Sequence, residues 1–79
     1  MNQTVPHDRI PPQNIEAEKS VLGSMLIENN VIDRAMELLN SESFYREAHR
    51  KIFNAILSLR DRHEAADIVT LAEELKKNN

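Results

Sequence analysis

The chain has 79 residues, no cysteine and a net charge of −3, with charged residues making up 29% of the sequence. So short a chain forms one domain at most, its core cannot be reinforced by disulfides or a thiolate metal site, and its modest charge gives no overall attraction to nucleic acid. A single glycine and 4% aromatic residues disfavour an all-β domain, so the composition favours an all-α chain.

Residues 1–12 contain all three prolines, Pro6, Pro11 and Pro12. Because proline pushes the preceding residue towards extended geometry, we expect a flexible arm ahead of a helical domain at residues 13–79. The arm lacks the apolar stretch of a signal peptide, and no apolar run in the chain approaches the ~20 residues of a membrane span. These features predict a cytoplasmic protein without membrane contact.

Four helices are predicted in a small orthogonal arrangement. The first follows Asn14 as N-cap and ends near residues 28–30, and the second covers residues 31–39 after "ENN", which can cap it. The polar "NSES" of residues 40–43 precedes a central helix that runs to about Arg62. The T-x-x-E spacing of Thr70 and Glu73 predicts a capping box that starts the last helix at Thr70.

Apolar residues at helical spacing predict the buried face of each helix. The predicted buried residues are Ile15, Val21, Leu22, Met25 and Leu26 in the first helix, Ile32, Ala35, Met36 and Leu39 in the second, Tyr45, Ala48, Ile52, Ala55, Ile56 and Leu59 in the third, and Leu71, Ala72 and Leu75 in the fourth. Gly23 lies mid-helix, where it costs about 1 kcal/mol relative to alanine, and this predicts a close helix crossing that compensates for it.

The sequence contains no recognisable catalytic, cofactor or metal motif. With one glycine, neither a P-loop nor a dinucleotide fingerprint can form. His7, His49 and His63 lack partners at ligand spacing, so we expect surface or rim histidines. Glu73 and Glu74 diverge around the helix axis and indicate capping and solvated charge. We therefore expect no enzyme activity, no cofactor and no metal.

Charge is concentrated in residues 46–62, which carry five basic and two acidic side chains, a local charge of +3. The basic residues are Arg46, Arg50, Lys51, Arg60 and Arg62. They form the polar back of an amphipathic helix and lack interleaved aromatic or amide side chains that read nucleic acid. A solvated or partner-docking face is favoured, and a small nucleic-acid-binding domain remains the alternative function.

Three segments carry a resemblance to a known family. "RIPPQNIEAEKSVLGSML" at residues 9–26 closely resembles the opening of bacterial replicative DNA helicases of the DnaB family. "SFYREAHRKIFNAILSL" at 43–59 and "DIVTLAEEL" at 67–75 are similar to later segments of the same family's N-terminal region.

The resemblance implies a helical N-terminal domain that forms a collar on a hexameric ring, acts in DNA replication and contacts primase. In the family a RecA-like ATPase domain, which uses ATP and Mg, follows this region, and we expect this chain to lack it. The implied partners are the C-terminal domain of primase and other helicase subunits, with a helicase loader as a further candidate and no direct DNA binding. We assign partner contact to Glu16, Lys19, Arg46 and Arg50.

Overall fold

The computed structural model describes residues 14–78, which form four α-helices, one 3-10 helix and no strand. The elements are α1 (Ile15–Ile27), α2 (Asn30–Leu38), η1 (Ser41–Ser43), α3 (Glu47–Asp61) and α4 (Ile68–Lys77). This confirms the predicted all-α class, and the "NSES" interruption is η1. The predicted arm at residues 1–12 and His7 lie outside the described residues.

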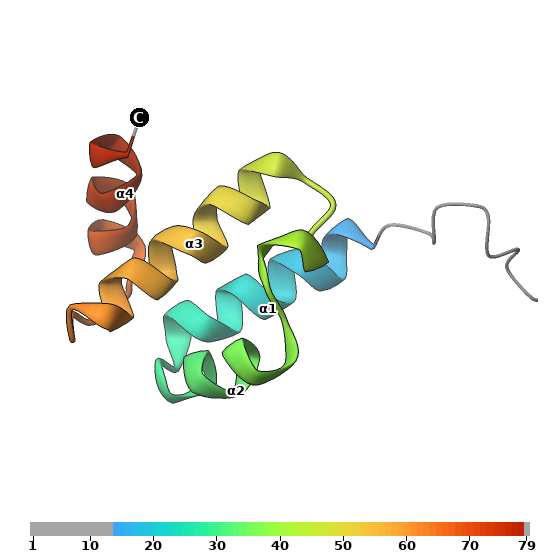
Figure 1. Ribbon diagram of the computed structural model, residues 1–79, viewed down its shortest axis with the longest axis horizontal. Coiled ribbons are helices and arrows are strands. Elements are labelled where there is room, and N and C mark those ends of the chain that lie inside the picture. The colour runs from blue at the N-terminus through green and yellow to red at the C-terminus, as the bar shows by residue number, and fades with distance from the viewer. Residues whose placement is uncertain (1–13, 79) are drawn as a thin grey trace, which may run out of the picture.

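The helices are arranged around α3. In Figure 1, α1 and α3 run in the same direction with their N-terminal ends at the same side of the molecule, while α2 turns back beneath α1. The last helix, α4, packs across the C-terminal part of α3 at a steep angle (Figure 1). All helices among residues 14–78 are too short or too polar to span a bilayer.

The core combines apolar side chains from all four helices. The largest fully buried ones are Phe53, Met25, Ile32, Ile56 and Leu59. The predicted apolar faces are confirmed at Met25, Ile32, Ile56 and Leu59. Phe53 joins them in the core, and its ring packs against that of Phe44 in a tilted arrangement with ring centroids 5.1 Å apart. Burial of this apolar surface is the main force that holds the helices together.

Some residues predicted for the buried faces are exposed. Tyr45 is 54% exposed because it lies in the extended segment before α3 and is therefore not on the helix face. Met36 in α2 and Ala48 and Ala72 in α3 and α4 also face solvent. In α4 the inward position is taken by Glu74, which is 4% exposed, so the prediction of a solvated Glu74 is wrong.

The helix starts are set by side chains that bond to free backbone N–H groups. Asn14 caps α1 as predicted, since its side chain accepts a hydrogen bond from Ala17 N–H at 3.0 Å. The prediction for α4 is wrong: Asp67 is its N-cap, and it forms a reciprocal capping box in which Asp67 accepts from Thr70 N–H and Thr70 Oγ1 accepts from Asp67 N–H, both at 2.9 Å. The helix therefore begins two residues before Thr70.

The side chain of Asn29 joins two distant parts of the chain. Although Asn29 is the N-cap of α2, its side chain does not cap that helix. Its amide group instead donates to the carbonyl oxygens of Met25 and Ala66, and its oxygen accepts from Ala66 N–H, each at 2.9 Å. Ala66 is buried, so its backbone N–H and C=O need partners within the protein. The Asn29 side chain pairs with both groups and thereby fixes the loop before α4 against the end of α1.

The end of α3 contains the one left-handed non-glycine residue among the described positions. His63 has φ 61°, and the chain closes with Glu64 N–H donating to Leu59 O and His63 N–H donating to Arg60 O, both at 2.9 Å. This is the Schellman pattern, in which glycine is the usual residue at the left-handed position. Because this position is histidine and not glycine, the turn could not be recognised from the usual residue pattern.

Gly23 does not lie at a close helix crossing. A Cβ atom added at this position would have no described heavy atom within 4 Å other than those of its own helix backbone and chain neighbours. The predicted compensation for a mid-helix glycine is therefore wrong, because the described residues leave open space beside it.

Candidate functional site

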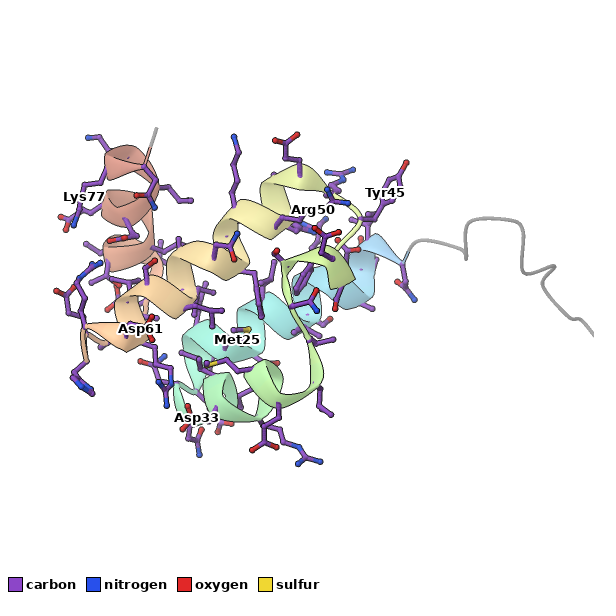
Figure 2. All side chains as sticks on the ribbon, in the orientation of Figure 1. Met25, Asp33, Tyr45, Arg50, Asp61 and Lys77 are labelled. Atoms are coloured by element: carbon purple, nitrogen blue, oxygen red, sulfur yellow. The ribbon has the colours of Figure 1, made fainter. Side chains whose placement is uncertain are left out.

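The four residues predicted to contact a partner come from two helix ends that the structure places together. Glu16 and Lys19 lie in the first turns of α1, and Arg46 and Arg50 lie at the start of α3. Both helices begin at the same side of the molecule (Figure 1), and Tyr45 and Arg50 mark that side in Figure 2, whereas Asp61 and Lys77 lie at the opposite side. We call the surface of Glu16, Lys19, Tyr45, Arg46 and Arg50 the contact end.

The α1 part of the contact end is a solvated ion pair. Lys19 Nζ lies 3.5 Å from Glu16 Oε2, three residues apart on the helix, and both side chains are more than half exposed. Such exposed pairs contribute little to stability, and their charges can be redirected to an outside group at small cost. Glu16 is also favoured by the positive end of the α1 dipole.

The α3 part contains two arginines, of which Arg50 forms a side-chain hydrogen bond within residues 14–78 and Arg46 does not. Arg46 is exposed, and its side chain makes no hydrogen bond to other residues in the range 14–78. Arg50 is half-buried, and its Nε donates to Phe44 O at 2.7 Å, so it also holds the chain segment that leads into α3. Of the two, Arg46 has the charge more available to a partner.

A buried pair lies directly beneath the contact end. His49 Nδ1 is 2.7 Å from Glu18 Oε1, and Glu18 Oε2 accepts from Tyr45 N–H at 2.7 Å. The Tyr45 N–H is the main cause that lowers the pKa of Glu18 below its usual value; burial opposes this, and the hydrogen bond from His49 adds to it. Since an ionised carboxylate only accepts hydrogen bonds, His49 Nδ1 is the donor.

The prediction of a surface or rim position is wrong for His49, which is 8% exposed. His49 precedes Phe53 by four residues and Ile56 by seven, and this spacing places it on the buried face of α3. This helical periodicity is the sequence feature from which the burial of His49 could have been predicted. A search for metal-ligand spacing could not reveal a carboxylate partner 31 residues away.

A second buried carboxylate joins α3 to α4 at the other side of the molecule. Arg62 donates to the two oxygens of Glu74 at 2.6 and 3.2 Å, and Lys77 Nζ lies 3.6 Å from Glu74. The Arg62 guanidinium is the main cause that lowers the pKa of Glu74. Glu73, by contrast, is exposed as predicted.

The basic stretch 46–62 does not form one open positive surface. Arg62 binds Glu74, Arg60 forms an ion pair with Asp33 of α2, and Arg50 donates to the Phe44 carbonyl. Three of the five basic side chains therefore have partners within the domain, and only Arg46 and Lys51 lack one among residues 14–78. Phosphate binding along this helix would require these bonds to be exchanged, which weakens the nucleic-acid alternative.

Within the same described range, no three histidine, aspartate or glutamate side chains gather into a group that could hold a metal ion.

Comparison with known proteins gives consistent matches. The family model for the DnaB-like helicase N terminal domain matches residues 10–79. The chain is 49% identical over 69 residues to the replicative DNA helicase DnaC of Bacillus subtilis (strain 168), which covers 87% of this chain and 15% of that protein. It is 50% identical over 68 residues to the replicative DNA helicase DnaB of Geobacillus stearothermophilus, covering 86% and 15%. The chain thus spans about 15% of the length of both relatives.

The fold is also similar to a solved structure. The crystal structure of the N-terminal domain of DnaB helicase from Mycobacterium tuberculosis aligns with a TM-score of 0.83 and 46% identity, over 87% of this chain and 50% of that one.

Proposed function

Because the chain belongs to the family of DnaB-like helicase N-terminal domains, we propose that it serves DNA replication as a non-catalytic interaction module of a replicative helicase. In this role it contributes to the organisation of a hexameric ring and contacts the C-terminal domain of primase, with a helicase loader as a further partner. Residues 13–79 act as one domain, and ATP and Mg are used by a separate RecA-like ATPase domain of the helicase.

The observation that carries the proposal is the family match over residues 10–79, which falls on the N-terminal domain of a helicase. The geometry supports it, since the contact end offers Glu16, Lys19 and Arg46 as exposed charges on a rigid helical frame. Charges held on rigid elements favour selective recognition of a partner surface, because little order has to be created on binding.

A titration followed by NMR tests the primase contact. Isotope-labelled protein is mixed with the C-terminal domain of the primase from the same organism, and single-stranded DNA at two salt concentrations serves as the parallel sample. We expect localised amide shifts at Glu16, Lys19, Arg46 and Arg50 with primase. Shifts spread evenly over the domain, or none, would refute the contact. Shifts with DNA alone, centred on residues 46–62 and lost in salt, would support the nucleic-acid alternative.

Charge reversal gives the matched control. Lys19→Glu and Arg46→Glu remove positive charge at the contact end, whereas Lys76→Glu makes the same change on an exposed position of α4. We expect the first two variants to weaken primase binding and the third to leave it unchanged. In the complete helicase, sedimentation of the same variants measures whether ring assembly also depends on the contact end.

A further inference from the structure

One largely buried carboxylate, that of Glu18, connects the two halves of the contact end. Glu18 belongs to α1, yet both of its hydrogen-bond partners, Tyr45 N–H and His49 Nδ1, lie at the start of α3, 27 and 31 residues away in the sequence. The side chains of Glu18 and His49 are 12% and 10% exposed. Hydrogen bonds to an ionised group in such a partly dry environment are short, strong and directional.

The segment that Glu18 holds lies outside regular helix. Phe44 and Arg46 both have extended backbone geometry, and the chain between them carries the exposed Tyr45 side chain. Other contacts also hold this segment: Arg50 Nε donates to Phe44 O, Arg50 N–H donates to Arg46 O, Phe44 N–H donates to Ser41 O, and the Phe44 ring packs against Phe53. The partners in these contacts lie in η1, in α3 or in the segment itself, so among residues 14–78 Glu18 supplies the side-chain hydrogen bond that ties the segment to α1.

We propose that Glu18 is a positioning residue for the contact end: by holding the Tyr45 backbone and His49, it fixes Tyr45 and Arg46 of the α3 half relative to Glu16 and Lys19 of the α1 half. This inference rests on the proposed function, because the surface so arranged is the one that meets primase. Glu18 itself does not touch the partner, since its carboxylate is already directed inward onto two donors. Its effect on binding is therefore indirect.

The structure supplies a matched control in Glu74. Like Glu18, Glu74 is a carboxylate with little solvent exposure that joins two elements through hydrogen bonds, here α4 to Arg62 at the end of α3. It lies at the opposite side of the molecule, the side marked by Asp61 and Lys77 in Figure 2. A general loss of stability would affect both sites, whereas a positioning role concerns Glu18 alone.

The experiment compares Glu18→Ala, Glu18→Gln and Glu74→Gln, with the folded fraction followed by circular dichroism. The readouts are hydrogen exchange of the Tyr45 amide and affinity for the primase C-terminal domain. We expect Glu18→Ala to remove the protection of this amide and to weaken binding roughly fivefold or more, the lower end of the range for coupled sites. Glu18→Gln keeps an oxygen that accepts from Tyr45 N–H, and it should therefore retain most of the amide protection and most of the affinity for primase. Glu74→Gln should leave both unchanged.

Binding by folded Glu18→Ala at wild-type affinity, or equal weakening by Glu74→Gln, would overturn the proposal. If Glu18→Ala does not fold, Glu18→Asp replaces it, because a carboxylate one methylene shorter cannot reach both donors from the same backbone; the expected changes are the same. If the wild-type protein does not bind the primase domain, the proposed function fails, and the amide readout still decides whether Glu18 holds the segment.

Discussion

Replacing Gly23 with alanine should stabilise the domain. In a helix interior alanine is favoured over glycine by about 1 kcal/mol, because glycine loses more backbone entropy on folding. The added methyl group would meet no described atom within 4 Å, so no steric term opposes this gain. For a domain of this size, 1 kcal/mol corresponds to a rise of about 4–8 °C in Tm.

Thermal and urea denaturation followed by circular dichroism measure the effect. The control is the reverse substitution, Ala72→Gly, at an exposed position inside α4. It should lower the free energy of unfolding by a similar amount. A Gly23→Ala variant that is less stable than the wild type, while Ala72→Gly behaves as expected, would refute the reasoning. Such a result would mean that the space beside Gly23 is filled in solution.

Three further predictions concern the links between elements. Asn29→Ala leaves both backbone groups of buried Ala66 unpaired, so the free energy of unfolding measured in urea should fall by about 1–3 kcal/mol. An unchanged free energy would show that water replaces the side chain. Asp67→Ala should lose about 1 kcal/mol as an N-cap; if Thr70→Ala alone is destabilising, Asp67 is not the cap. Because the folded pKa of Glu74 is lowered from 4.5, its stabilisation is present above pH 4.5 and lost as the pH falls below it, so the acid-induced drop in Tm should be smaller in Glu74→Gln.

The parts of the fold that depend on neighbouring residues could be predicted from the sequence. The N-cap of α1 and the apolar faces follow from spacing within one helix, and the structure confirms them at Asn14, Leu22, Met25 and Ile56. The start of α4 was placed too late because the local sequence allows two capping boxes. Asp67 with Thr70 and Thr70 with Glu73 have the same spacing, and the first is the one that forms.

The remaining features depend on contacts between distant residues or on the path of the chain. Asn29 meets Ala66 across 37 residues, and Glu18 meets His49 across 31, distances over which residue spacing carries no information. The left-handed turn at His63 is set by the route from α3 into α4, since non-glycine residues adopt a positive φ in only a few per cent of cases even though histidine is enriched among them. For the candidate site, Glu16, Lys19 and Arg46 are exposed, as expected of residues that meet a partner, and their contact with a partner stays a prediction. The exposure of Tyr45 was predicted wrongly, and the pair of Glu18 and His49 beneath the contact end was missed.

Contacts of the basic side chains within the domain explain why the charge of residues 46–62 is misleading when counted along the sequence. Glu18 lies beside the N-terminal end of α3 and Arg62 follows its C-terminal end, so each has the sign that the helix dipole favours. Arg62 and Arg60 are directed towards α4 and α2, where they connect helices and do not present charge to a ligand. The positive charge at the contact end is thereby reduced to Lys19, Arg46 and Arg50. A discrete patch of this size, bordered by Glu16 and the exposed Tyr45, matches a protein surface better than a continuous phosphate backbone.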